Sequence, residues 1–178
     1  CGSGTFPIEA AMIGANIAPG LNRAFAAEKW KHLFAPKLWY DAIEEANDEM
    51  NPDISMDIQG YDIDDEIIRC ARQNAKDAGV DKLIHFQQRP VSELHHPKKY
   101  GFINTNPPYG ERLLDIRAAE ELYRTMGKVF TPKKKWSYNI ISPDETFEEC
   151  YGRKADRRRK LYNGMIKCQF YMYYKSGI

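Results

Sequence analysis

Short apolar stretches alternate with amphipathic segments along most of the chain, and this alternation restricts the fold more than any other feature of the sequence. Strands are predicted at 54–62, 83–88, 100–106 and 136–142, and helices at 6–16, 64–79, 115–131 and 143–152. Because parallel strands are joined by crossovers, this order favours a parallel sheet covered by helices. Near the end of the chain, Asn163-Gly164 separates two alternating aromatic segments, which predicts an antiparallel hairpin. We therefore expect an α/β fold, a three-layer α/β/α sandwich with a mostly parallel sheet that ends in the hairpin.

The first residues bear on domain organisation. The sequence opens on CGSGTFPIEAA, a glycine-rich turn that leads into a helix, and no strand precedes that turn. A parallel sheet needs its first strand, so we expect that strand to be missing and the single domain, residues 1–178, to be truncated at its amino end. Residues 24–50 are typical of one or two helices interrupted near Pro36, within a helical insertion expected at about 18–52.

Composition excludes several classes of protein. The chain has 178 residues, of which 43% are hydrophobic and 29% charged, as in one folded globular domain. No run approaches the roughly 18 apolar residues of a membrane span, so we expect a cytoplasmic protein. The four cysteines lie far apart without a C-x-x-C pair, and the four histidines form no ligand spacing with them. We therefore expect neither a metal site nor a disulfide framework.

Charge is unevenly distributed along the chain, although the net charge is only +1. Residues 151–178 contain eight basic side chains and one acid, Asp156. Between Asp41 and Glu66 there are eleven acids and no base. A basic segment of this kind suggests a polyanionic partner, with a solvated surface as the alternative interpretation of RKADRRRK.

Two features suggest a cofactor site. The Gly2-Ser3-Gly4 turn lets the backbone approach a ligand at a helix amino terminus, although such a turn alone is more often an ordinary tight turn. Asp62 closes the strand predicted at 54–62, where a carboxylate can accept hydrogen bonds from both ribose hydroxyls of an adenosine-containing cofactor. The alternative is that Asp62 starts the following helix as one of its capping acids.

The sequence Asn106-Pro107-Pro108-Tyr109, which follows a predicted strand, carries the most chemistry. Two successive prolines fix φ and remove N–H donors, so the Asn106 side-chain oxygen and a nearby carbonyl can accept both hydrogens of a ligand amine. That arrangement localises the nitrogen lone pair for attack on a methyl group. The ring of Tyr109 offers a face on which a flipped base can stack. The alternative is a rigid Pro-Pro turn at a strand end.

The motifs CGSGT, GYDID and NPPYGER, in this order, resemble those of the Rossmann-like class I methyltransferases that use S-adenosylmethionine to modify amino groups of nucleic-acid bases. More narrowly, CGSGTFPIEAAMIGANIAPGLNRAFAAEKW, TNPPYGERL and RKLYNGMIKCQFYMYY look like the catalytic domain of the THUMP-containing rRNA guanine-N2 methyltransferases. The resemblance covers nearly the whole chain. It implies an S-adenosylmethionine-dependent methyltransferase domain over residues 1–178 and a THUMP domain upstream in the full-length chain.

The resemblance also implies roles for individual residues. The cofactor-binding set would be Gly2, Gly4, Thr5, Asp62, Ile63 and Asn106, with Asp62 on the ribose and Ile63 on the adenine. The target-base site would be Asn106, Pro107, Pro108 and Tyr109. The RNA-binding residues would be Arg153, Lys154, Arg157, Arg158, Arg159 and Lys160. Family members usually have an acid after the third strand that binds the cofactor adenine amine, and Pro90 stands at that place here.

The function implied is methyl transfer to the N2 amine of a guanine in large-subunit ribosomal RNA, without a covalent intermediate or a metal. Neither Cys1 nor Cys70 is placed as an obvious nucleophile, which argues against cytosine-C5 chemistry. Two alternatives stay open. One is a DNA adenine-N6 methyltransferase, because the NPPY motif also suits an adenine amine. The other is a noncatalytic RNA-binding or assembly factor with the same fold.

Overall fold

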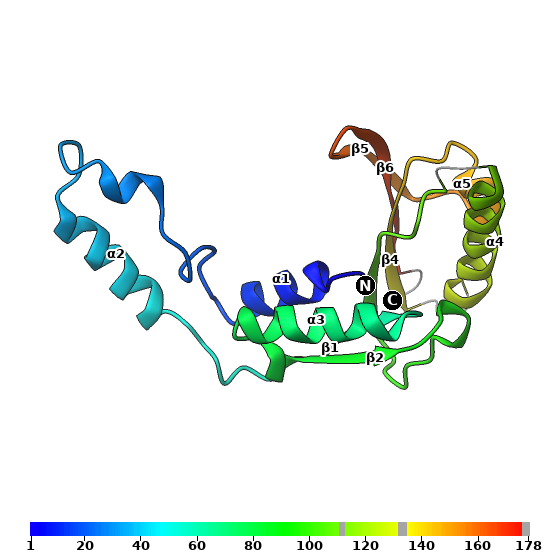
Figure 1. Cartoon of the computed structure of the whole chain (residues 1–178). Coiled ribbons are helices and arrows are strands. Elements are labelled where there is room, and N and C mark those ends of the chain that lie inside the picture. Colours follow the sequence, from blue (N-terminus) through cyan, green and yellow to red (C-terminus); the bar gives the residue numbers. More distant parts are fainter. Residues whose placement is uncertain (111–112, 132–134, 176–178) are drawn as a thin grey trace. The chain divides into compact units, whose positions relative to one another are not determined.

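The computed structural model describes residues 1–110, 113–131 and 135–175 and divides into two compact units, Cys1–Gln88 and Arg89–Ile178 (Figure 1). Each unit has its own sheet and its own hydrophobic core. No helix among the described residues is long and apolar enough to cross a membrane.

The first unit contains a two-stranded parallel sheet with helices packed against it. Its elements are α1 (Thr5–Gly14), η1 (Ala26–Lys29), α2 (Pro36–Asp48), β1 (Ile58–Asp62), α3 (Asp65–Asp77), η2 (Asp81–Leu83) and β2 (Ile84–Gln88). The register runs from Ile58 opposite Ile84 to Asp62 opposite Gln88, so both strands end at the same edge of the sheet. Buried side chains of α1, α3 and β2 form the core, among them Ile8, Ala71 and Phe86.

Helix α3 is bounded by a capping residue at its start and by a glycine after its end. Asp64 is the N-cap, and its side chain accepts a hydrogen bond from the Glu66 N–H at 2.8 Å. After the helix, Gly79 takes a φ of +73°, a left-handed conformation that glycine adopts without steric cost. The apolar stripe of α3, which includes Ile68, Ala71 and Ala75, is fully buried. The helix predicted from this segment is confirmed.

The second unit contains a mixed four-stranded sheet in the order β3-β4-β6-β5. Its elements are η3 (Val91–Glu93), β3 (Gly101–Thr105), α4 (Leu113–Phe130), β4 (Trp136–Ser142), α5 (Phe147–Tyr151), β5 (Arg157–Asn163) and β6 (Ile166–Tyr173). β3 and β4 are parallel, whereas β6 is antiparallel to both β4 and β5. The core is rich in aromatic rings contributed by α4, α5, β4 and β6: Tyr123, Phe130, Tyr138, Phe147, Tyr151, Tyr171 and Tyr173.

Three expectations are corrected in detail. β1 begins at Ile58 rather than at residue 54, because Met56 packs its sulfur against Gly14 of α1 instead of joining the sheet. The hairpin turn consists of Gly164 and Met165, since Asn163 already pairs with Ile166. Of the four strand pairs described, two are parallel and two antiparallel, so the sheets are mixed rather than mostly parallel.

Candidate functional site

The glycine turn before α1 depends on two backbone conformations that disfavour side chains. Gly2 has a φ of +57° and Gly4, the N-cap of α1, has a φ of +87°. A Cβ on Gly4 would also lie 3.0 Å from the Cβ of Ala71, so α1 approaches α3 more closely here than a side chain would allow. Thr5 is the first residue of α1, and its hydroxyl is exposed 3.3 Å from that of Ser3. The turn therefore presents the hydroxyls of Ser3 and Thr5 to solvent, while the N–H groups of Gly2 and Gly4 are hydrogen-bonded within the unit.

Asp62 is bound to this turn. Its Oδ2 accepts hydrogen bonds at 2.9 Å from the Gly2 N–H and from the Cys1 amino group, and its Oδ1 accepts one at 3.2 Å from the Asp64 N–H. Partial burial raises the pKa of the Asp62 carboxyl, but the hydrogen bonds from the Gly2 and Asp64 N–H groups lower it, and the pKa lies below its usual value. Asp62 is therefore an ionised acceptor at neutral pH. The capping role that was its alternative falls to Asp64.

An apolar side chain and an amide flank Asp62. Ile63 follows it directly and is 69% exposed, which is unusual for isoleucine. Gln88 lies opposite Asp62 in the register, and its Nε2 donates to the Ile63 carbonyl at 3.0 Å. Pro90 belongs to the second unit, where it is the N-cap of η3 with a φ of −69°. The strand edge at Asp62 thus carries a carboxylate, an apolar surface and a fixed amide.

Asn106 and Tyr109 are joined by a hydrogen bond just after β3. The Tyr109 hydroxyl donates to Asn106 Oδ1 at 2.6 Å, and Asn163 Nδ2 of β5 donates to the Tyr109 oxygen at 3.1 Å. Burial raises the pKa of Tyr109, while the hydrogen bond from Asn163 acts in the opposite direction. Tyr109 therefore keeps its proton at neutral pH and orients the Asn106 amide oxygen. One of the two lone pairs of that oxygen stays available to a ligand donor.

A buried network supports the two prolines. Pro107 is buried, and the Pro108 carbonyl faces the hydroxyl of Tyr123 at 3.5 Å. Tyr123 comes from α4 and is fully buried, and its hydroxyl accepts a 3.1 Å hydrogen bond from Ser142 Oγ at the end of β4. The segment from Asn106 to Tyr109 is therefore attached to two core elements besides β3. Glu111 and Arg112, which follow it in the NPPYGER motif, lie outside the described residues.

Two side chains of the basic segment form ion pairs. Arg153 forms an ion pair with Asp156 at 3.0 Å, and Arg158 forms a bidentate pair with Glu148. The other four basic candidates are exposed: Lys154, Arg157, Arg159 and Lys160. Alternate residues of a strand point to the same face, so Arg157 and Arg159 share a face of β5 with Asn163, which contacts Tyr109.

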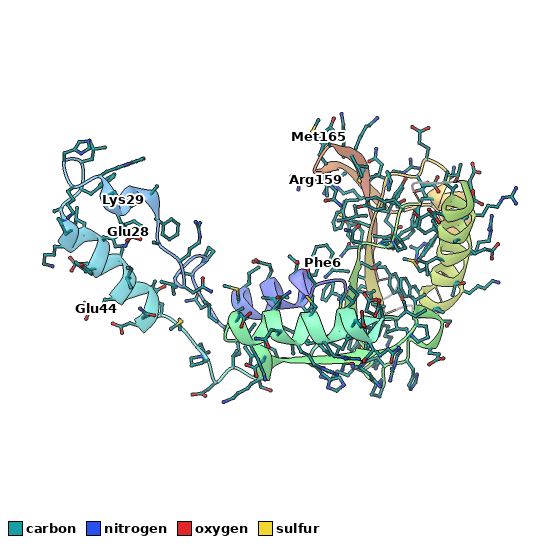
Figure 2. All side chains as sticks on the ribbon, viewed as in Figure 1. Phe6, Glu28, Lys29, Glu44, Arg159 and Met165 are labelled. Carbon is teal, nitrogen blue, oxygen red and sulfur yellow. The ribbon has the colours of Figure 1, made fainter. Side chains whose placement is uncertain are left out.

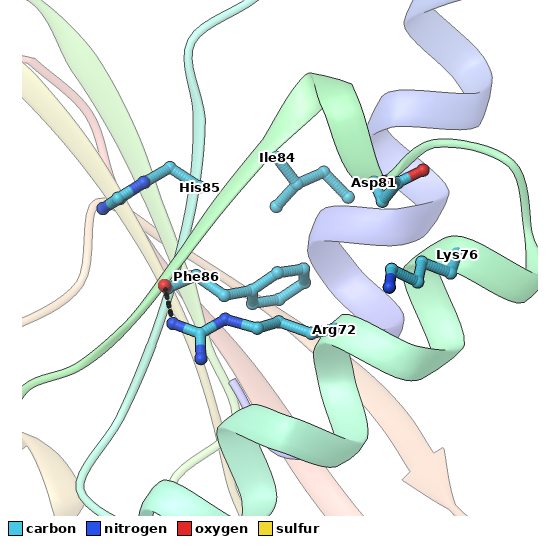
Figure 3. Close-up of a pocket in the computed structure, with 6 residues that line it drawn as sticks. All are labelled: Arg72, Lys76, Asp81, Ile84, His85 and Phe86. Carbon is cyan, nitrogen blue, oxygen red and sulfur yellow. Dashed lines mark hydrogen bonds between the residues drawn. The ribbon is translucent and has the colours of Figure 1, made fainter.

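A shallow pocket of about 300 Å³ lies between α3 and β2 and is lined by Arg72, Lys76, Asp81, Ile84, His85 and Phe86 (Figure 3). Arg72 donates to the Phe86 carbonyl at 2.7 Å across it. This pocket lies at the start of β2, whereas Asp62 and Gln88 mark the other end of the two parallel strands. It is therefore separate from the edge that carries Asp62. Among the described residues, no group of three or more His, Cys, Asp or Glu side chains could hold a metal ion.

A family model described as the RMKL-like methyltransferase domain matches residues 1–172. The chain belongs to this family. The YpsC protein of Bacillus subtilis (strain 168), named as a candidate RNA methyltransferase, is 45% identical to this methyltransferase domain over 176 residues, which are 99% of the domain and 46% of YpsC. The ribosomal RNA large subunit methyltransferase K/L of Shewanella baltica (strain OS185) is 36% identical over 180 residues, 97% of the domain and 25% of the relative.

Solved structures share the architecture of the methyltransferase domain. SMU.472, a candidate methyltransferase complexed with SAH, aligns over 100% of the domain and 47% of its own chain, with 45% identity and a TM-score of 0.95. This similarity shows the α/β class I methyltransferase fold. The domain spans half or less of the length of these relatives.

The structure of the methyltransferase domain brings the predicted site residues together in two groups. In the first unit, Gly2 and Asp62 are hydrogen-bonded. In the second unit, Asn106 and Tyr109 are hydrogen-bonded, and Asn163 is added to them. The sequence predicts Asn163 only as a residue of the hairpin turn. The Asn-Gly pair was the available signal, but it indicates the hairpin and not the partner of the asparagine side chain.

Proposed function

We propose that this methyltransferase domain transfers a methyl group from S-adenosylmethionine to the N2 amine of a guanine in large-subunit ribosomal RNA. The observation that carries the proposal is the Asn106 amide oxygen, held at the end of β3 by the Tyr109 hydroxyl and left with one free acceptor site. An exocyclic amine needs such an acceptor. The names of the relatives, which describe RNA and ribosomal RNA methyltransferases, support the choice of RNA. Such a substrate also favours the cytoplasm as the place of action.

The residues at the edge of β1 fit S-adenosylmethionine. Asp62 is ionised and has acceptor capacity for ribose hydroxyls besides its bonds to the turn. Ile63 offers an exposed apolar surface for an adenine ring. Gly2, Gly4 and Thr5 would border the methionine part, where Gly2 has open space around its backbone. A relative complexed with SAH, the demethylated form of this cofactor, supports the choice of cofactor.

Gln88 is suited to bind the adenine amine in place of the acid that Pro90 replaces. Its Nε2 donates a hydrogen bond to the Ile63 carbonyl, and this bond fixes the plane of the amide next to Ile63. The Gln88 Oε1 is then an oriented acceptor beside the surface proposed for adenine. We expect Gln88→Leu to weaken cofactor binding about tenfold, measured by calorimetry, because the hydrogen bond to the adenine amine and the orienting bond to the Ile63 carbonyl are both lost without a large change in volume.

When bound, the cofactor supplies a methyl group on a positively charged sulfur. Asn106 Oδ1 accepts one hydrogen of the target amine and localises the lone pair of its nitrogen, and Tyr109 offers its ring to the base. The nitrogen–carbon bond forms as the carbon–sulfur bond breaks and its electron pair passes to sulfur. The extra proton on the nitrogen then leaves to water, because the Asn106 amide is not a base. The chain contributes by positioning the reactants.

The exposed basic side chains of β5 are suited to RNA phosphates. Arg157 and Arg159 lie on the face of β5 that also carries Asn163, so phosphates bound there would flank the proposed base site. Such contacts add affinity rather than sequence choice. We expect the double variant Arg157→Gln with Arg159→Gln to weaken RNA binding. The slope of log binding constant against log salt concentration should become shallower by the amount that about two phosphate contacts contribute. Arg158→Gln is a poor probe, because its ion pair with Glu148 would also be lost.

The deciding experiment incubates the protein with labelled S-adenosylmethionine and undermethylated ribosomal RNA or genomic DNA, followed by mass spectrometry of the nucleosides. We expect N2-methylguanosine from the RNA. N6-methyladenine from DNA would contradict the proposal in favour of a DNA methyltransferase. Failure to bind S-adenosylmethionine would contradict it in favour of a noncatalytic factor. Asn106→Ala should abolish transfer and leave cofactor binding largely intact. Asn104→Ala, on β3 two residues earlier, is the matched control and should keep activity.

A further inference from the structure

Residues 18–52, here called the arm, leave the hydrophobic core of the first unit and return to it at one point. The Asn51 N–H donates to the Ala15 carbonyl at 2.8 Å, and Asn16 Nδ2 donates to the Glu49 carbonyl at 3.0 Å. Asn16 takes a φ of +53°, which turns the chain out of α1. Both ends of the arm are therefore fastened next to the carboxyl end of α1, and η1 and α2 lie between them (Figure 1).

Helix α2 of the arm is amphipathic, yet none of its residues is buried. At 100° per residue its apolar side chains fall on one side and its acids on the other. The apolar side consists of Leu38, Trp39, Ala42, Ile43 and Ala46. Trp39 is partly covered by an edge-on contact with Phe25, with ring centroids 5.4 Å apart. A helix of 13 residues is marginal in water on its own, so an uncovered apolar face calls for a partner.

The apolar surface of the arm is as large as an interface requires. Its exposed large side chains are Trp30, Leu33, Phe34, Leu38, Tyr40 and Ile43, with Leu33 and Leu38 more than 60% exposed. Together they present on the order of 600 Å², close to the roughly 800 Å² that each partner buries in a standard interface. Monomers seldom leave so much apolar surface in one region uncovered.

Charge on the arm indicates which partner covers it. Residues 18–37 carry four basic side chains and one acid, whereas residues 38–52 carry five acids and no base. Figure 2 labels Lys29 on the first part and Glu44 on the second. The acidic part would repel the phosphates of RNA. A second arm in antiparallel orientation would instead place each basic part against an acidic part, as a two-fold axis requires.

We propose that the arm pairs with the arm of a second copy of this chain around a two-fold axis. The apolar side chains of the two arms cover each other, and the opposite charges set the antiparallel direction. This inference does not depend on the proposed enzymatic function, because it uses only residues 18–52.

Sedimentation velocity of the chain at increasing concentration tests the pairing. We expect a dimer whose dissociation constant rises at least tenfold in Leu38→Asp and in Phe34→Asp. Both residues are exposed, so circular dichroism should stay unchanged. Met165→Asp is the matched control, because Met165 is 97% exposed on the β5–β6 turn. A wild-type chain that stays monomeric, or a dimer that Met165→Asp weakens equally, would overturn the proposal.

Charge reversal tests the orientation. Lys29→Glu with Lys31→Glu makes both parts of the arm acidic, and Glu44→Lys with Glu45→Lys reduces the acidity of the second part and adds basic groups to it. Each variant alone should dimerise more weakly than the wild type, whereas an equimolar mixture should form a heterodimer. A mixture that is no more dimeric than its components would refute the antiparallel pairing. Loss of RNA binding in the Leu38→Asp variant of a monomeric chain would assign the arm to RNA instead.

Discussion

Asn163 provides the sharpest test of the proposed base site. Its amide donates at 3.1 Å to the Tyr109 oxygen, and Tyr109 donates at 2.6 Å to Asn106, so the effect of Asn163 on Asn106 passes through one hydroxyl. A neutral hydrogen bond contributes about 0.5 to 1.5 kcal/mol net. Asn163 is exposed, and water can replace its amide, so the loss lies at the lower end of that range. We expect Asn163→Ala to lower kcat about threefold.

Tyr109→Phe removes both hydrogen bonds but keeps the ring. Because Asn106 then loses the donor that orients it, we expect a loss of about tenfold or more in kcat. In the Tyr109→Phe background, Asn163→Ala should have no further effect, since the hydroxyl through which it acts is gone. Asn163→Asp should be worse than Asn163→Ala, because a carboxylate there would compete with Asn106 for the Tyr109 proton.

The assay is multiple-turnover methyl transfer to RNA from labelled S-adenosylmethionine, which gives kcat, with cofactor affinity measured separately by calorimetry. Asn139→Ala is the matched control, since its amide also donates to another side chain, Asn104, at 2.8 Å. We expect that variant to keep the wild-type rate. The reasoning would be refuted if the double variant lost kcat by the product of the two single losses of Asn163→Ala and Tyr109→Phe. It would also be refuted if Asn163→Ala and Asn139→Ala lost kcat equally.

Two further predictions concern stability. Gly4→Ala should destabilise the protein by about 1 to 3 kcal/mol in denaturant unfolding, because of its φ and its contact with Ala71; Gly79→Ala, also at positive φ but in open space, should cost less. Burial raises the pKa values of Tyr138 and Tyr171 to about 12, so these tyrosines ionise more readily when unfolded. The contribution of these tyrosines to the free energy of unfolding should be fully present below pH 10. It should then fall by about 1.4 kcal/mol per pH unit for each tyrosine as the pH rises to 12. Tyrosinate absorbance and circular dichroism measure the two effects. A stability that stays constant over that interval would contradict this assignment.

The parts of the fold that could be predicted are those with local signals. Asp64 caps the start of α3, and Gly79 ends the helix in a left-handed conformation, as in many helices. The order of β3, α4, β4 and α5 follows the periodicity of the apolar residues. The start of β1 could not be predicted in this way. Met56 continues the alternation of a strand, but it packs against α1, and alternation alone does not tell which element an apolar side chain contacts.

The candidate site shows the same division. The positions of Asp62 at a strand end and of Asn106 after β3 follow from the sequence order. The contact between Asn163 and Tyr109 does not, because 54 residues separate them and only the register of β5 with β6 brings the amide into place. The ion pair between Arg158 and Glu148 likewise joins a residue of β5 to one of α5. Long-range pairing of this kind has no local signature.

The fastening of residues 18–52 next to α1 has a consequence for how this domain can change. Because the bonds of Asn16 and Asn51 hold both ends of the excursion together, the chain between them contributes little to the geometry of β1 or of the glycine turn. Changing the length of a loop whose ends are already joined alters its closure entropy only slowly. Related domains can therefore lengthen, shorten or exchange this segment while they keep the same cofactor edge, and an engineered domain could carry a different binding module at that position.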